Sequence, residues 1–193
     1  MQRIFVMVMI GVFLMAGAGQ TMAQEKEIVG VKFPGQVVVE GKTLTLNGVA
    51  ARKAMGFIKV YAAGFYLEKP TKDPKEAIES EQVKHFVFHY LTDQATAKKL
   101  QEGFIELMEK CNPPELVTAH KADIEKHAAW MDKDMAPGKT SKTTYVPGVG
   151  LIVEYQGEVK GTIPGKDYAQ MYYRYNLGEK VDAGLRDGFL GLK

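Results

Sequence analysis

Residues 48–70 read GVAARKAMGFIKVYAAGFYLEKP, and this stretch indicates the fold more clearly than any other part of the chain. Its second part, Phe57–Glu68, is the longest candidate strand and carries apolar residues on both faces. A strand of that kind is typical of the centre of a sheet that is covered on each side. The first part is rich in glycine and alanine and contains Arg52, which predicts a loop that leads into the strand.

Further strand signals lie on both sides of this stretch. The β-branched run at 37–39 and the alternating residues Thr43–Leu46 flank Gly41, which predicts a hairpin. Residues 24–34 are predicted to form a lead-in or a first edge strand, and Val83–Leu91 a further strand. Three short strands are predicted near the C-terminus, at 143–146, 151–155 and 159–163, with glycine-containing turns between them.

Helical signals lie between and after these strands. A short helix is predicted to begin at Pro74, because proline suits the first helical position. Thr92 or Asp93 is predicted to cap a longer helix that ends at Cys111, before two prolines. Further helices are predicted at 114–132, 166–176 and 181–190. The order of strands, helices, strands and helices predicts an α+β fold with an antiparallel sheet.

The charge pattern argues against a nucleic-acid partner. The chain has 25 Lys and Arg residues against 23 Asp and Glu, a formal net charge of +2, and the two signs are interspersed. Proteins that bind nucleic acid or an anionic membrane through charge concentrate their cations in a patch or a block. The sequence shows no block of this kind, so its charge pattern predicts neither a nucleic-acid nor an anionic-membrane partner.

Residues 1–23 have the three parts of a secretory signal. Arg3 supplies the basic start, Ile4–Gly19 is an apolar segment, and the small residues Thr21 and Ala23 suit a cleavage site. The apolar segment has about 16 residues, short of the ~20 that span a bilayer, so an uncleaved anchor is the weaker alternative. Cleavage after Ala23 would leave 24–193 as one domain, periplasmic or secreted, with no integral membrane span.

No metal or cofactor is predicted. His85 and His89 lie ~13 Å apart along one strand, and His120 and His127 lie ~10 Å apart along one helix, so neither pair can share an ion. There is no phosphate loop, no nucleophile elbow and no pair of cysteines. The single Cys111 cannot form an internal disulfide, and we expect it to be buried and inert, with a dimer-forming or reactive thiol as the alternative.

Arg52 is the first candidate binding residue. Among small neighbours, its side chain would be free to turn inward to the mouth of an apolar pocket. There a guanidinium would bind a carboxylate bidentately, or a phenolate. The alternative is an ordinary arginine in a solvated loop.

The quoted stretch resembles the early segment of chalcone isomerase-like proteins, in which an arginine-containing loop leads into a strand ending Gly-aromatic-Tyr-Leu-Glu. The preceding KFPGQVVVEGKTLTLNG, residues 32–48, resembles the opening hairpin of that family, and residues 178–191 resemble its terminal helix. The resemblance spans nearly all of 24–193 and is closest to the exported bacterial branch. It implies a large antiparallel sheet with helices packed against it.

The plant enzymes of this family, which close chalcones into flavanones, use an arginine, two threonines, a tyrosine and an asparagine around a cleft. Arg52 matches the arginine. The two threonines correspond to Tyr61 and to a position near Tyr175, the tyrosine to a position near Thr96, and the asparagine to one near Gly103. Because only the arginine is matched, the resemblance does not imply flavonoid cyclisation.

Other members of the family bind fatty acids in the same cleft, with an arginine and a tyrosine holding the carboxylate. The resemblance therefore implies a non-catalytic site for a small lipophilic carboxylate or phenolic ligand. Lys59 shares a face with Tyr61 under strict strand alternation and would add a second cation. The predicted ligand-binding residues are Arg52, Lys59, Tyr61, Thr96 and Tyr175.

Two other functions remain open from the sequence. The protein would be an isomerase or intramolecular lyase acting on an enone-like substrate if Arg52 stabilised an oxyanion and Tyr61 donated a proton. Alternatively, it would be a structural or partner-binding envelope protein if side chains fill the cleft. An open apolar tunnel that ends at Arg52 would favour the binding function.

Overall fold

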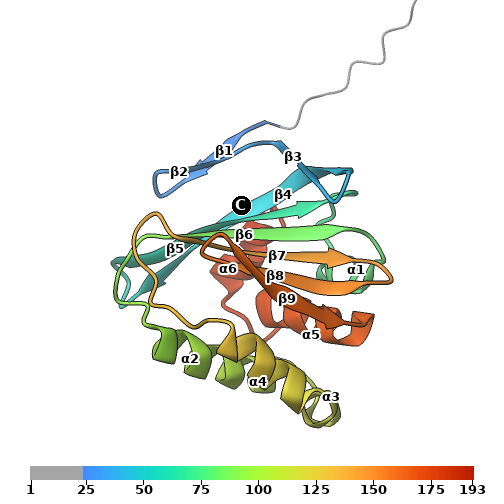
Figure 1. The fold of residues 1–193 in the computed structure, drawn as a ribbon. Coiled ribbons are helices and arrows are strands. Elements are labelled where there is room, and N and C mark those ends of the chain that lie inside the picture. The colour runs from blue at the N-terminus through green and yellow to red at the C-terminus, as the bar shows by residue number, and fades with distance from the viewer. Residues whose placement is uncertain (1–23) are drawn as a thin grey trace, which may run out of the picture.

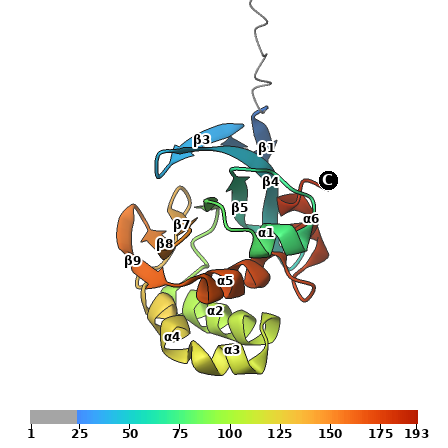
Figure 2. The same cartoon turned by 90° about the vertical axis from the view of Figure 1, so that its right-hand side faces the viewer.

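The computed structural model describes residues 24–193, so the predicted signal at 1–23 lies outside the described residues. Seven strands form one antiparallel sheet in which every strand pairs with its neighbours in the sequence. The strands are β3 (Gln36–Val39), β4 (Lys42–Ala54), β5 (Ile58–Leu67), β6 (Lys84–Tyr90), β7 (Thr140–Val146), β8 (Gly150–Tyr155) and β9 (Glu158–Pro164). The sheet curls into a half-barrel (Figures 1 and 2).

Six helices accompany the sheet among the described residues. They are α1 (Pro74–Glu79), α2 (Ala97–Cys111), α3 (Pro114–Ala119), α4 (Lys121–Ala129), α5 (Lys166–Leu177) and α6 (Ala183–Phe189). Helix α5 packs on β8 and β9, whereas α2 packs on α4 and α5 (Figure 2). The predicted α+β fold, with a large antiparallel sheet and helices packed against it, is confirmed. No helix within 24–193 has the length and apolar character needed to cross a bilayer.

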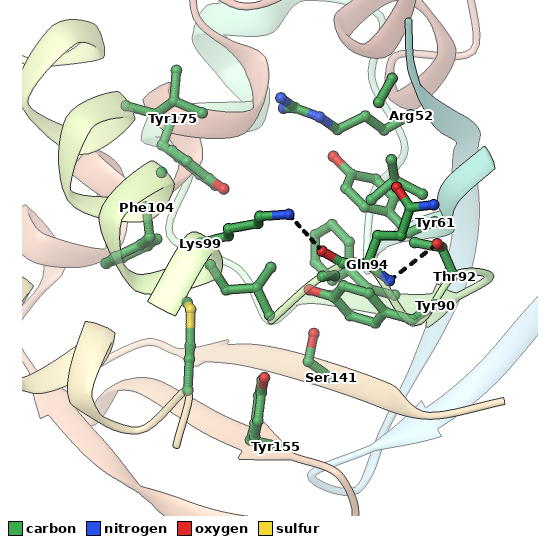
Figure 3. Close-up of a pocket in the computed structure, with 18 of the residues that line it drawn as sticks. Arg52, Tyr61, Tyr90, Thr92, Gln94, Lys99, Phe104, Ser141, Tyr155 and Tyr175 are labelled. Carbon is green, nitrogen blue, oxygen red and sulfur yellow. Dashed lines mark hydrogen bonds between the residues drawn. The ribbon is translucent and has the colours of Figure 1, made fainter. Parts of the chain in front are cut away.

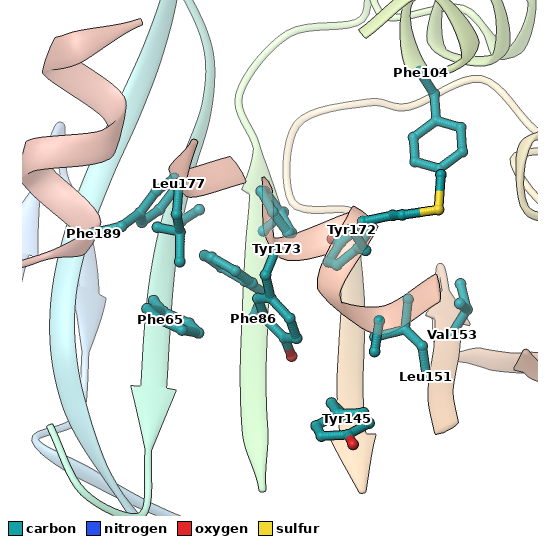
Figure 4. Packing of buried hydrophobic residues seen from close by; sticks show 14 of the residues in the cluster. Phe65, Phe86, Phe104, Tyr145, Leu151, Val153, Tyr172, Tyr173, Leu177 and Phe189 are labelled. Carbon is teal, nitrogen blue, oxygen red and sulfur yellow. The ribbon is translucent and has the colours of Figure 1, made fainter. Parts of the chain in front are cut away.

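The main core lies between the sheet and the helices. Phe65 of β5 stacks on Phe86 of β6 with ring centroids 4.3 Å apart, and Phe189 of α6 meets Phe86 edge-on at 4.9 Å. Tyr173 of α5 packs against the same rings (Figure 4). These aromatic contacts join the centre of the sheet to the two C-terminal helices.

A second apolar cluster covers the opposite face of the sheet. It is built on Tyr66 and on Phe33, which belongs to a separate two-stranded sheet of β1 (Lys26–Ile28) and β2 (Val31–Phe33). Because Phe65 and Tyr66 are adjacent in β5 and enter different clusters, β5 is covered on both faces, as the sequence predicts.

The predicted loop around Arg52 is wrong, because this segment continues β4 as far as Ala54. The small residues of the segment allow the backbone of α6 to approach β4 closely. A Cβ atom at Gly48 would lie 2.1 Å from the carbonyl oxygen of Gly188. Nearby, the amide of Asn47 donates a 2.8 Å hydrogen bond to the carbonyl of Phe189. Glycine and alanine therefore mark a close packing contact here.

The helices differ from prediction at two boundaries. Helix α2 begins at Ala97, later than expected, because Thr96 caps it, whereas the hydroxyl of Thr92 accepts a hydrogen bond from the backbone of Gln94. The helix predicted at 114–132 is divided into α3 and α4 at His120, whose φ of −108° and ψ of 19° leave the helical region.

Candidate functional site

A pocket of about 370 Å³ opens between one end of the sheet and the helices α2, α4 and α5. Its walls are mostly apolar and aromatic, with a few polar groups among them. Such a composition is typical of small-molecule sites. The lining residues that decide its character are Arg52, Tyr61, Lys99, Phe104, Tyr172 and Tyr175.

The mouth of the pocket can be located from the exposure of its lining residues. Arg52, Met55, Gln94 and Lys99 line the pocket and are nevertheless exposed. Met55 is 84% exposed, and a residue that is both exposed and in contact with the pocket must lie where the pocket opens to solvent. The mouth therefore lies where the end of the β4–β5 hairpin meets the start of α2.

The inner part of the pocket is formed by buried side chains whose polar atoms bind one another. The hydroxyl of Thr143 donates to that of Tyr172 at 3.1 Å, and the hydroxyl of Tyr155 donates to the carbonyl of Lys133 at 2.7 Å. Nδ1 of His127 lies 2.9 Å from the hydroxyl of Tyr168. Because these groups already have partners, the inner wall offers a ligand mainly apolar surface.

Arg52 and Tyr61 lie side by side at the mouth. They are paired in the register of β4 and β5, and the guanidinium extends over Tyr61 toward Tyr175 (Figure 3). Burial raises the pKa of Tyr61, and the positive charge of Arg52 opposes part of that shift. Within residues 24–193, Arg52 has no ion-pair partner. The mouth therefore presents an unpaired cation beside a protonated phenol.

Lys99 brings a second cation to the mouth from the opposite wall. It stands on α2, and its ammonium group donates a 3.5 Å hydrogen bond to the backbone carbonyl of Gln94 (Figure 3). Residues 99, 103 and 107 recur at helical spacing, and all three line the pocket. Nothing in the sequence distinguishes Lys99 from the neighbouring lysines; the only local sign of a cavity on this helix face is the small Gly103 one turn further along.

A smaller pocket of about 180 Å³ adjoins the first. Four residues, Arg52, Tyr61, Leu107 and Tyr175, line both pockets, so these side chains form the partition between them. Cys111 lines the smaller pocket and is half-buried; burial raises the pKa of its thiol. In the part of the chain that the structure describes, no three His, Cys, Asp or Glu residues are placed to hold a metal.

Comparison with known proteins identifies the family. The family model described as chalcone isomerase-like matches residues 25–191. The chain belongs to the chalcone isomerase-like family. No curated protein matches it. Among solved structures, this chalcone isomerase-like protein is similar to a fatty-acid binding protein of Arabidopsis thaliana, with a TM-score of 0.67 and 16% identity over 83% of this chain and 92% of that chain.

Three of the five predicted ligand-binding residues come together in this chalcone isomerase-like protein. Arg52 and Tyr61 meet at the mouth, and Tyr175 of α5 lies nearby, its ring 5.4 Å from that of Phe104. Thr96 is not brought to the pocket, because its hydroxyl accepts a hydrogen bond from the backbone of Lys99 and caps α2.

Lys59 is also not brought to the pocket, and a β-bulge is the reason. Arg52 pairs with Tyr61 but Lys53 pairs with Lys59, so Val60 is an extra residue in β5. One inserted residue shifts the alternation of side chains beyond it to the other face. Accordingly, Ile58, Val60 and Tyr61 line the pocket, whereas Lys59 is exposed elsewhere.

Proposed function

We propose that this chalcone isomerase-like protein binds a fatty acid, or a similar small lipophilic carboxylate, without transforming it. The observation that carries the proposal is an apolar pocket whose mouth holds an unpaired guanidinium, that of Arg52. A carboxylate placed there keeps contact with water, so it avoids most of the cost of burying a charge. The alkyl chain then enters the apolar interior, where its burial supplies the binding energy.

The head-group contacts follow from the geometry of the mouth. The Arg52 guanidinium would bind both carboxylate oxygens, which is the strongest arrangement for this pair of groups. Tyr61 would donate from its hydroxyl, because its raised pKa keeps the phenol protonated. Lys99 would add charge from the opposite wall.

Two further observations support this function. The volume of about 370 Å³ lies within the range of ~300–1,000 Å³ that is usual for small-molecule sites. The Arabidopsis protein with a similar fold is a fatty-acid binding protein, although at 16% identity the likeness concerns the fold alone. We also propose that the protein acts after export, on the strength of the sequence of residues 1–23.

The same mouth also suits a second function, an isomerase or lyase reaction on an enone-like substrate. The observation in its favour is the pairing of the Arg52 cation with the protonated Tyr61, since such a pair would stabilise an enolate oxygen and supply a proton to it. Binding of saturated fatty acids does not require this chemistry.

Calorimetry with dodecanoate and dodecanol tests the binding function, because the two ligands share a chain and differ in charge. Arg52→Gln should weaken dodecanoate binding ~10–100-fold, as expected for a charge-assisted hydrogen bond of ~1.5–3 kcal/mol, and should change dodecanol binding little. Lys59→Gln is the matched control, because Lys59 is an exposed cation on the neighbouring strand outside the pocket. Equal loss in both variants, or no dodecanoate binding by the wild type, would refute the proposal.

A further inference from the structure

The end of the β4–β5 hairpin carries the two most exposed large apolar side chains in the described part of the chain. Met55 is 84% exposed and Phe57 is 76% exposed. They are separated only by Gly56, at which a Cβ atom would have no neighbour within 4 Å. Nothing within residues 24–193 covers this turn, which we call the hairpin tip (residues 55–57).

The strands that carry the hairpin tip are basic. Lys53 and Lys59 are paired in the register of β4 and β5, so two cations stand directly opposite each other. Like charges in that position destabilise a sheet. Both lysines are exposed and, within residues 24–193, neither has an ion-pair partner. No Asp or Glu occurs between Glu40 and Glu68.

The hairpin tip is continuous with the mouth of the pocket. Met55 belongs to both, and Ala54 and Ile58 at the base of the turn also line the pocket. The exposed apolar surface therefore leads directly from the outside of the molecule into the apolar interior.

We infer that the hairpin tip docks the protein on an anionic lipid bilayer. Met55 and Phe57 enter the interface between head groups and acyl chains, and Lys53 and Lys59 bind the lipid phosphates. The mouth of the pocket then faces the bilayer, and a lipophilic ligand exchanges between pocket and membrane without crossing water. That last step rests on the function proposed above; the docking does not.

The shape and charge of the surface favour a bilayer over a protein partner. Two exposed apolar side chains on one short turn fit a deformable lipid surface, whereas stable protein interfaces bury ~800 Å² on each partner. Apolar and aromatic residues flanked by lysines are the usual composition of segments that lie in a membrane interface. The near-neutral charge of the whole chain conceals this local concentration of cations.

Vesicle sedimentation tests the docking, with vesicles of phosphatidylcholine alone or mixed with phosphatidylglycerol. The wild type should bind the mixed vesicles, and added salt should weaken binding, because exposed charges are screened. Phe57→Ser and the double variant Lys53→Gln/Lys59→Gln should each bind at least tenfold more weakly. Val38→Ser should bind as the wild type does, since Val38 is 75% exposed but lies on β3, outside the hairpin.

Several outcomes would overturn the inference. One is that the wild type does not bind the mixed vesicles, and another is that Phe57→Ser binds them as tightly as the wild type does. A third is a dimer in solution that Phe57→Ser dissociates, because the hairpin tip would then contact a second copy of the chain. Calorimetry with dodecanoate separates the two proposals, because Phe57, Lys53 and Lys59 do not line the pocket. Vesicle binding without dodecanoate binding would refute the proposed function alone, and the reverse result would refute the docking alone.

Discussion

Arg52 on β4 and Tyr61 on β5 are paired directly across the two strands, at the last register position before Val60 is inserted into β5. The insertion turns Val60 and Ile58 toward the pocket beside Tyr61 and leaves Lys59 outside. One irregularity in β5 thus places Lys59 on the same outer face as Lys53, away from Arg52. Arg52 lines the pocket, whereas Lys53 and Lys59 stand on the outer surface of the hairpin.

Tyr61→Phe should weaken dodecanoate binding by ~3–10-fold, because one hydrogen bond is lost and the ring is kept. Since burial raises the pKa of Tyr61, the wild-type phenol remains a donor throughout the neutral range, and this contribution should not change between pH 7 and pH 9. Calorimetry at the two pH values measures both effects. Tyr66→Phe is the control, because Tyr66 packs in the cluster on the opposite face of the sheet; equal loss in both variants would exclude a specific role for Tyr61.

The protein should not accelerate the conversion of chalcone to flavanone. That reaction needs several groups to hold the phenolate near the enone, and the hydroxyl of Thr96, one of the positions that correspond to the plant site, caps α2 instead of facing the pocket. The rings of Tyr61 and Tyr175 stand beside Arg52 and narrow the space for a flavonoid. The assay follows the loss of chalcone absorbance and the chirality of the product. Rapid formation of one enantiomer, abolished by Arg52→Ala, would contradict the non-catalytic function.

Gly48→Ala should lower the free energy of unfolding by about 2 kcal/mol or more, in the range of overpacking substitutions. The new methyl group would lie 2.1 Å from the carbonyl oxygen of Gly188 and 2.6 Å from that of Phe189, so α6 must move away from β4. Urea unfolding measures the change. Gly103→Ala is the control and should increase the free energy of unfolding. A Cβ atom at this position meets nothing within 4 Å, and alanine favours the helix by ~0.5–1 kcal/mol. Equal effects of the two substitutions would show that α6 does not pack as described.

Because of Lys84, the free energy of unfolding should increase as the pH rises from about 8 toward 10. Its ammonium group is buried, donates to the carbonyl of Ile78 and lies 4.7 Å from the ring centre of Tyr173. Burial lowers its pKa from 10.5 to about 8, partly offset by Glu81. Between these values the unfolded chain binds more protons than the folded protein, so the free energy of unfolding increases with pH.

The variant Lys84→Met isolates this effect in urea unfolding at pH 7.5 and pH 9.5. The stability of the wild type relative to the variant should rise by ~1–2 kcal/mol, since one pKa unit corresponds to ~1.4 kcal/mol. Lys75→Met, which removes an exposed lysine of α1, is the surface control. Parallel profiles for the wild type and Lys84→Met would show that Lys84 does not titrate in this range.

The elements of the sheet could be predicted from the sequence, because their signals are local. The alternation of Phe65 and Tyr66 indicates a strand with two apolar faces, and the turn residues between strands indicate antiparallel neighbours. The family resemblance, carried mainly by residues 32–70 and 178–191, led to the right family, and the positions that correspond to the plant site include Arg52, Tyr61 and Tyr175, which the structure brings to one pocket.

Only the tertiary structure decided which of the candidate binding residues meet at the pocket. Arg52 belongs to a strand because its segment pairs with β5, and α6, some 140 residues further along the chain, packs on the small residues before it. Lys59 is turned away by a single inserted residue, and Lys99 reaches the mouth because α2 packs on α4 and α5 and leaves a space above the sheet. The sequence by itself determined most of the strands, though not the part of β4 that carries Arg52, because turn and alternation signals act between near neighbours. Contacts between distant segments, and a one-residue change of register, decided the site.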